Sequence, residues 1–157
     1  MAEPSSPADL LWHGPRQIGS GALIFDSDHR VLLVKHTYGK FNWEIPGGVS
    51  EAGESVNQTV VREVREETGL DVEPERLSGV YYSGPDDMHH FAFICRLIDP
   101  HAKPVPSSPE IADCRFFDRD RLPSPISDFS IRRIDDAMAR PPALTITRIG
   151  PRVWFEE

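Results

Sequence analysis

The segment from Ser55 to Gly69 carries both the start and the stop signals of an α-helix, so it constrains how the rest of the chain packs. Ser55 is a favourable N-cap, and Gln58 follows three residues later, which predicts a capping box. Gly69 stands where the end of a helix favours a left-handed residue. An apolar side chain recurs every four positions and predicts one stripe that faces a core, formed by Val56, Val60 and Val64.

Three carboxylates lie on the same predicted helix, at Glu63, Glu66 and Glu67. Their spacing places them side by side on the helix surface, where each pair of like charges costs about 0.2–0.5 kcal/mol. At about 100° per residue they fall beside the apolar stripe, half sheltered from water. A solvated acidic face is the ordinary alternative. A divalent cation would neutralise the cluster, and oxygen ligands are those that Mg²⁺ and Mn²⁺ prefer.

The composition indicates an ordinary globular chain of single-domain length, with 157 residues and a net charge of −8. An acidic chain does not have the basic footprint of a protein that binds nucleic acid. Cys95 and Cys114 have no metal-ligand spacing, so we expect two buried thiols in a reducing cytosol, with a disulfide as the alternative. The sequence shows neither a signal peptide nor an apolar stretch of membrane-spanning length. We therefore expect a cytoplasmic protein, monomer or homodimer, with no membrane partner.

The remaining elements follow from apolar runs and turn residues. Residues 17–25 and 31–36 read as strands joined by the turn DSDHR, as a hairpin or as two adjacent strands. Residues 37–48 read as a loop that ends in Pro46-Gly47-Gly48, where the backbone can approach another group closely. Further strands are expected at 77–84, 89–97 and 110–118, with a Pro-rich loop at 99–109.

A second helix is expected after Asp128, which is its candidate cap, and Pro141-Pro142 should stop it. Ile131, Ile134 and Met138 would share its apolar face. Residues 144–155 alternate in polarity and predict an edge strand or a hairpin, while residues 1–15 read as a loose arm. Strands with two separated helices predict a mixed sheet covered by helices.

The stretch GVSEAGESVNQTVVREVREETGL, from Gly48 to Leu70, resembles the signature of the Nudix hydrolases, with every fixed position filled. WEIPGG, at 43–48, looks like the approach to that signature in many members, and the likeness in strand order covers about residues 17–123. The resemblance implies an α/β Nudix fold, with a mixed β-sheet sandwiched between helices. Residues 1–157 would then form a single domain with an N-terminal arm, 1–15, and a C-terminal extension, 143–157.

The resemblance also implies residue roles. The metal ligands, for Mg²⁺ or Mn²⁺, would be the carbonyl of Gly47 and the carboxylates of Glu63, Glu66 and Glu67. More than one ion is expected, since three carboxylates exceed what one Mg²⁺ needs. Glu66 is the candidate that helps the attacking water. Arg62 precedes it by four residues and would orient it. The structural positions of the motif would be Gly48, Glu54 and Gly69, with Glu54 tying the loop to the helix through Arg62 or backbone N–H groups.

Other candidates rest on less. Glu110 opens a strand where many relatives carry one more acidic ligand or base; the alternative is a surface carboxylate. Trp43 is a candidate to stack on a base, or a buried loop aromatic. His89 and His90 are candidate substrate contacts, and Asp86 and Asp87 are candidates for a base outside the signature. Arg132 and Arg133 are expected on a solvated helix face.

The family resemblance implies a pyrophosphohydrolase acting on a small nucleotide, a nucleoside diphosphate linked to a group X. Pro85 lies fifteen residues past Leu70, and a proline near that offset recurs in members that hydrolyse ADP-ribose. Turn chemistry is the plain reading of Gly84-Pro85-Asp86-Asp87. ADP-ribose or a related nucleotide-sugar is the first expectation. The alternatives are a nucleoside triphosphate or oxidised nucleotide, as in pool-sanitising members, and a non-catalytic nucleotide-sensing module.

Overall fold

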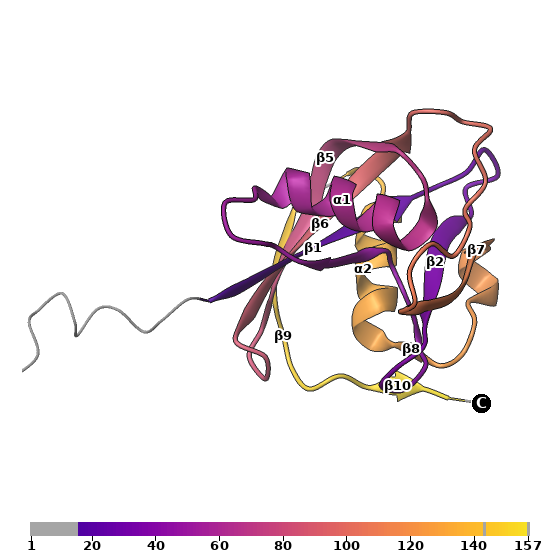
Figure 1. Ribbon diagram of the computed structural model, residues 1–157. Coiled ribbons are helices and arrows are strands. Elements are labelled where there is room, and N and C mark those ends of the chain that lie inside the picture. The colour runs from indigo at the N-terminus through magenta and orange to yellow at the C-terminus, as the bar shows by residue number, and fades with distance from the viewer. Residues whose placement is uncertain (1–15, 143, 157) are drawn as a thin grey trace, which may run out of the picture.

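The computed structural model describes residues 16–142 and 144–156, and the predicted arm at 1–15 lies outside them. The chain folds into two five-stranded sheets and two α-helices (Figure 1). The first sheet has the order β4-β1-β6-β5-β9 and the second β10-β8-β3-β2-β7. Both sheets mix parallel and antiparallel pairs. The predicted α/β class is confirmed, with two mixed sheets in place of one.

The first sheet consists of β1 (Gln17–Ile24), β4 (Gly47–Val49), β5 (Val72–Ser83), β6 (Met88–Leu97) and β9 (Thr145–Ile149). The second consists of β2 (Val31–His36), β3 (Trp43–Glu44), β7 (Ile111–Phe117), β8 (Ile126–Ser127) and β10 (Trp154–Phe155). The helices are α1 (Val56–Thr68) and α2 (Asp128–Met138), with a short 3₁₀ turn at Arg119–Arg121.

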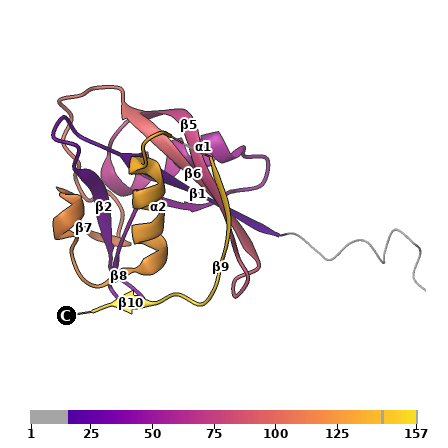
Figure 2. The same cartoon turned by 180° about the vertical axis from the view of Figure 1, so that it is seen from behind.

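Helices α1 and α2 cover opposite sides of the strands. Helix α1 packs on β1, β4 and β5, whereas α2 packs on β5, β8 and β1. Figure 1 shows α1 in front of the strands, and Figure 2, seen from behind, shows α2 in front of them. The predicted layering of helix, sheet and helix is therefore present.

Alternate side chains of the inner strands supply both layers of the core. In β1, Ala22 and Ile24 pack toward α1, while Leu23 packs toward α2. In β2, Leu32 and Val34 pack toward α1, and Val31 and Leu33 face the other way. Because successive side chains of a strand point to opposite faces, a strand buried on both faces reads as one apolar run. This explains why these two strands were visible in the sequence.

The hairpin reading of the first two strands is not what the structure contains. The turn after β1 closes with a single bridge, between Phe25 and Val31, and then β1 and β2 enter different sheets. The predicted loop at 37–48 also contains the short strands β3 and β4. The predicted strands at 77–84, 89–97 and 110–118 are present, the first beginning earlier, at Val72.

The end of the chain pairs with both sheets. Strand β9 runs parallel to β5, and β10 is antiparallel to β8. In Figure 2 the tail runs down the side of the molecule from the end of α2 to β10. An edge strand was predicted here and is present, but the two strands do not form a hairpin.

Helix α2 differs from its prediction in cap and in face. Ser127 is the N-cap, since its side chain accepts a hydrogen bond from the Ser130 N–H. Of the predicted apolar face, Ile134 is buried and Met138 is exposed. Arg133, which we expected on a solvated face, is buried. Cys95 and Cys114 are buried free thiols, as predicted. No helix in the described part of the chain has the length and apolar character to span a membrane.

Candidate functional site

Helix α1 begins and ends as its sequence predicts. The Ser55 hydroxyl accepts a hydrogen bond from the Gln58 N–H, and the Gln58 side chain accepts one from the Ser55 N–H. Gly69 is left-handed, with φ of 70°, and its N–H donates to the Arg65 carbonyl. Val60 and Val64 are fully buried on the core face. The helix therefore presents its carboxylates from a fixed position.

The Arg62 guanidinium is the centre of a hydrogen-bond network on α1. It donates to both carboxylate oxygens of Glu54, at 2.7 and 3.0 Å, and to Glu63 Oε1 at 2.8 Å. It also donates to Glu66 Oε2 at 3.2 Å and to the carbonyl of Val49 at 3.0 Å. Both predicted partners, Glu54 and Glu66, are within reach of Arg62. One guanidinium thus ties the loop and the strand β4 to the acidic face of the helix.

Glu54 is held as an anion by these contacts. The Arg62 hydrogen bonds, with a further one from the Glu51 N–H at 3.0 Å, lower the pKa of Glu54 to about 2. The same contacts raise the pKa of Arg62. Through Arg62, Glu54 therefore connects the loop before α1 to the helix.

The carboxylates of the helix have different surroundings. Glu67 is 6% exposed, and its Oε2 accepts a hydrogen bond from the Gly47 N–H at 3.1 Å. Burial, aided by the charge of Glu63, raises the pKa of Glu67 to about 9. Burial also raises the pKa of Glu63, although Arg62 opposes it. Glu66 is the most exposed of the three carboxylates. Partial shielding from water was expected for all three carboxylates, but only Glu63 has intermediate exposure, whereas Glu66 is exposed and Glu67 is buried.

Two consecutive glycines bring β4 against this cluster. A Cβ on Gly48 would lie 2.4 Å from Glu63 Oε1, and a Cβ on Gly47 would lie 2.2 Å from the Ser20 carbonyl oxygen. The close backbone approach expected at Pro46-Gly47-Gly48 is therefore present. The negative charge of Glu110 contributes to raising the pKa of both Glu63 and Glu67, after burial and the nearer carboxylates.

These donors fit a divalent cation. Glu63 and Glu67 have raised pKa values because negative charge gathers in a poorly solvated place, and a cation would relieve that cost. In the described ranges, 16–142 and 144–156, no three acidic, His or Cys side chains are already arranged around a common point. The carboxylates of Glu63 and Glu66 accept hydrogen bonds from Arg62, and that of Glu67 accepts one from the Gly47 N–H.

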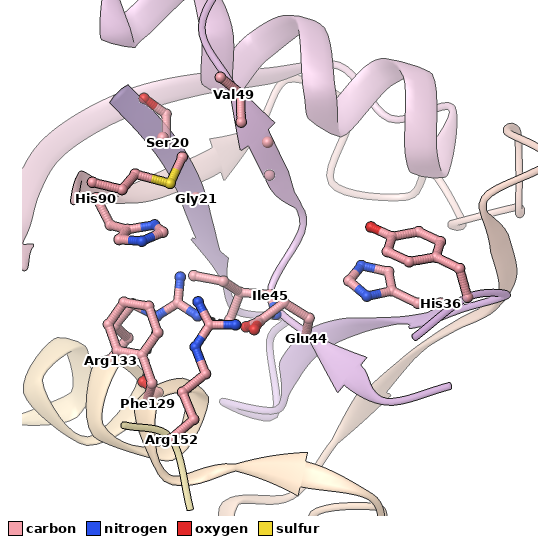
Figure 3. A pocket seen from close by; sticks show the side chains of 15 residues that line it. Ser20, Gly21, His36, Glu44, Ile45, Val49, His90, Phe129, Arg133 and Arg152 are labelled. Carbon is pink, nitrogen blue, oxygen red and sulfur yellow. Dashed lines mark hydrogen bonds and ion pairs between the residues drawn. The ribbon is translucent and has the colours of Figure 1, made fainter. Parts of the chain in front are cut away.

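A cavity of about 220 Å³ opens on the other side of β4 (Figure 3). Gly47 and Gly48 form one wall, so the cavity adjoins the acidic cluster. His36 and Tyr38 lie at one side, with their rings stacked at 4.8 Å between centroids. The opposite side is formed by His90, Phe129, Arg133 and Arg152.

A buried ion pair supports the floor of this cavity. Glu44 Oε1 accepts hydrogen bonds from Arg133 Nη2 at 2.6 Å, from the Ser130 hydroxyl at 2.7 Å and from the Ile45 N–H at 2.9 Å. Burial raises the pKa of Glu44, but Arg133 and these donors outweigh it, so the pKa is lowered. Arg133 also lies over the Phe129 ring, 3.8 Å from its centroid.

Sequence reasoning missed Glu44, Arg133 and Arg152. A local signal existed for Glu44, a carboxylate inside the apolar WEIPGG stretch. Arg133 offered no comparable signal, because its partner lies 89 residues away. His90 does line the cavity, whereas His89 is exposed and packs on Tyr82.

The other weak candidates lie away from the cavity. Trp43 is 5% exposed and packs edge-on against Phe117, so the structure favours its reading as a buried aromatic. Pro85 is exposed in the turn between β5 and β6. In that turn Asp87 binds Arg16 and the Tyr82 hydroxyl, and Asp86 accepts from the Ser83 hydroxyl.

A family model described as a NUDIX domain matches residues 15–137. The chain belongs to the NUDIX family. An ADP-ribose pyrophosphatase from Methanocaldococcus jannaschii is 35% identical over 103 residues, which are 64% of this chain and 61% of that relative. The chain thus spans about three fifths of the length of this curated relative. The acidic face of α1 lies within the stretch from Gly48 to Leu70 that resembles the NUDIX signature.

Solved NUDIX structures have the same fold. The crystal structure of an ADP-ribose pyrophosphatase from Streptococcus suis matches with a TM-score of 0.69 and 26% identity, covering 84% of this chain and 99% of that one. The crystal structure of a UDP-X diphosphatase matches with a TM-score of 0.70 and 25% identity, covering 88% of this chain and 72% of that one. The NUDIX fold is therefore established by sequence and by architecture.

Proposed function

We propose that this chain is a metal-dependent pyrophosphohydrolase that cleaves a nucleoside diphosphate linked to another group X, with ADP-ribose or a related nucleotide-sugar as substrate. The observation that carries the proposal is the shared wall at Gly47-Gly48. One side of it contacts the carboxylates of α1, and the other lines the cavity. A diphosphate at this wall could contact both a cation and the groups that bind X.

The metal set comprises Glu63, Glu66, Glu67 and the Gly47 carbonyl, with Glu110 as a further acidic ligand. Mg²⁺ or Mn²⁺ in this set would polarise a phosphoryl oxygen and lower the pKa of a bound water. Arg62 orients the carboxylates of Glu63 and Glu66 through hydrogen bonds, and Glu54 holds the Arg62 guanidinium in position. Glu66, the most exposed of the three helix carboxylates, is the group that accepts a proton from the attacking water.

The names of two relatives support the substrate. ADP-ribose pyrophosphatase is the printed name of the relative from Methanocaldococcus jannaschii and of the structure from Streptococcus suis. The UDP-X diphosphatase structure, by its name, also acts on a nucleoside diphosphate linked to a group X. The cavity beside the diphosphate site offers stacking and polar groups for such a molecule.

The test is a product panel separated by HPLC with excess Mg²⁺. It covers ADP-ribose, nucleotide-sugars, dinucleotides, and normal and oxidised nucleoside triphosphates. AMP with a sugar phosphate from ADP-ribose supports the proposal. A nucleoside monophosphate with pyrophosphate from a triphosphate, and no reaction with ADP-ribose, would replace it with a nucleotide-pool function.

Glu66→Gln distinguishes an enzyme from a nucleotide sensor. The variant should lose most turnover and keep the fold, because Glu66 is exposed and its amide can still accept from Arg62. Glu73→Gln is the matched control, since Glu73 is an exposed strand residue paired with Arg96. A sensor would bind nucleotide equally well in both variants and show no turnover in either.

Metal dependence is tested on the same panel. Turnover should require Mg²⁺ or Mn²⁺ and rise at mildly alkaline pH, because a bound water must lose a proton. Metal should also raise the melting temperature, since a ligand that binds only the folded state stabilises it by about 2.7 kcal/mol at a hundredfold excess over Kd. Turnover that survives EDTA contradicts this mechanism.

A further inference from the structure

One residue that lines the cavity, Arg152, lies beyond the NUDIX match, which ends at residue 137. The segment from β9 to β10 crosses from the first sheet to the second, and Arg152 lies on this segment. Its position is fixed by two backbone contacts of the next residue. The Asp128 N–H donates to the Val153 carbonyl at 2.8 Å, and the Val153 N–H donates to Asp128 Oδ1 at 3.0 Å. The tail thus holds Arg152 at the cavity in a defined way.

The Arg152 guanidinium faces the cavity beside that of Arg133 (Figure 3). It lies 5.3 Å from the centroid of the Phe129 ring, and the Arg133 guanidinium lies over the same ring. Among the described residues its one ion pair is with Asp86, at 4.0 Å. The side chain of Asp86 is 53% exposed and does not line the cavity, so water screens that contact.

Charge at this end of the cavity is not balanced by the residues that line it. Arg133 is neutralised by Glu44, whereas Arg152 has no carboxylate of its own among the lining residues. His90, the neighbouring titratable group, is uncharged at neutral pH, because burial and the charges of both arginines lower its pKa to about 4. Its Nε2 is buried without a partner in the described structure. A surplus positive charge therefore remains in a chain whose net charge is −8.

We propose that Arg152 is a specificity-determining residue that binds an anionic group, a phosphate or a carboxylate, on the part of the substrate remote from the scissile diphosphate. The proposal rests on the proposed function and names the chemistry of X. The cavity reaches from Gly47-Gly48 to Arg152, so one molecule can contact the diphosphate site and the arginine together. A guanidinium presents paired N–H groups that match the oxygens of a carboxylate or phosphate.

The test uses substrates that differ by one charged group. UDP-glucose is compared with UDP-glucuronate, which carries a carboxylate in place of a hydroxymethyl group. ADP-ribose is compared with the analogue phosphorylated on its terminal ribose. In the wild-type protein the preferred anion should raise kcat/KM by about tenfold to a hundredfold over its neutral partner, the range expected of a charge-assisted hydrogen bond. The two pairs distinguish a carboxylate from a phosphate.

Arg152→Gln should remove this preference, chiefly by raising KM for the anionic substrate of each pair. Arg152→Lys should keep part of it, since the charge remains and the paired donors do not. Arg148→Gln is the matched control, because Arg148 lies on the same tail over the Tyr82 ring and does not line this cavity. Circular dichroism and melting temperature establish that all three variants are folded.

The outcomes separate the two proposals. Equal kcat/KM for both members of each pair in the wild-type protein overturns the role of Arg152 while the pyrophosphohydrolase function stands. A preference for the anionic substrate that persists in Arg152→Gln also overturns the role of Arg152 and leaves the pyrophosphohydrolase function standing. A protein that cleaves no diphosphate-linked substrate in the presence of metal overturns both.

Discussion

The Arg62 guanidinium donates hydrogen bonds to both oxygens of the Glu54 carboxylate, at 2.7 and 3.0 Å, across the turn that leads into α1. The same side chain reaches the carbonyl of Val49 in β4 and the carboxylates of Glu63 and Glu66. A planar group with five donors can serve this many acceptors at once, and an ammonium cannot. Arg62 thus sets the spacing between the loop, the strand and the acidic face.

Arg62→Lys should retain the positive charge but lose most of the hydrogen bonds that hold the loop, β4 and the acidic face of α1 together. We expect kcat to fall by about tenfold to a hundredfold, the cost typical of changing a group that orients metal ligands, with the metal concentration for half-maximal rate rising in parallel. Arg65→Lys is the control, because Arg65 is an exposed residue of the same helix paired with Asp71. Steady-state kinetics titrated with Mn²⁺ make the comparison, and equal effects in the two variants would refute the special role of Arg62.

Gly48→Ala should impair metal binding and leave the fold intact. The added Cβ meets the end of the Glu63 side chain, which can rotate away at small cost. Displacing that carboxylate should raise the Kd for Mn²⁺ about tenfold or more, with little change in the free energy of unfolding. Titration calorimetry and urea denaturation measure the two quantities. Gly150→Ala, at an open position, should change neither.

Gly47→Ala should behave in the opposite way. Its added Cβ would lie 2.2 Å from the Ser20 carbonyl oxygen and 2.7 Å from the Gly21 Cα, which are backbone atoms of the paired strand. Strand β1 must then move, so we expect a loss of stability of about 1–3 kcal/mol, as for overpacking of a core. Urea denaturation next to Gly48→Ala is the measurement. A variant as stable as wild type would show that β4 has more freedom than the pairing indicates.

Arg133→Met should destabilise the protein strongly. Removing the guanidinium takes the main counter-charge from the Glu44 carboxylate, whose side chain is 15% exposed. Breaking a fully buried pair in this way costs about 3–5 kcal/mol, which is the upper limit here. Arg132→Met is the control on the same helix, because Arg132 is exposed and its pair with Asp136 is worth less than about 1 kcal/mol. Urea denaturation at neutral pH gives both values, and similar losses in the two variants would contradict the buried pair.

His90 should make the protein less stable as the pH falls. Its pKa is about 4 in the folded protein against an ordinary value of 6.5, so the unfolded chain binds more protons between these values. The stability that His90 contributes is present above about pH 6.5 and is lost as the pH falls toward 4. His90→Gln should flatten that part of the curve. Unfolding free energies from pH 7 to pH 4 provide the test, with His89→Gln, at an exposed position, as the control.

The helix that carries the acidic cluster was predictable because its signals are local. Its cap, its left-handed terminus and its apolar stripe all lie between Ser55 and Gly69. The strands β1 and β2 were visible as apolar runs, but their arrangement was not. A turn such as DSDHR serves equally in a hairpin and at a corner between two sheets, and only tertiary packing decides which forms.

The cavity was not predictable from the sequence because distant segments build it. Glu44 lies in a two-residue strand, Arg133 comes from α2, and Arg152 comes from the tail. A charged residue on a helix is normally expected to face solvent, but Arg133 is buried. Its guanidinium is stabilised there by the hydrogen bond that it donates to the Glu44 carboxylate. The carboxylates on α1 could be identified in advance, whereas most of the residues that line the cavity could not.

The tail pairs with an edge of each sheet, through β9 and β10, and carries Arg152 between them. The groups assigned to the phosphate chemistry all come from an earlier part of the chain, before β9 begins. Under the two proposals, Arg152 therefore contributes to substrate choice from a stretch of sequence separate from the groups that act on the phosphates. Substitution of Arg152 is then expected to change which substrates bind without altering the groups assigned to bond cleavage, which makes the tail a suitable place to engineer a new selectivity.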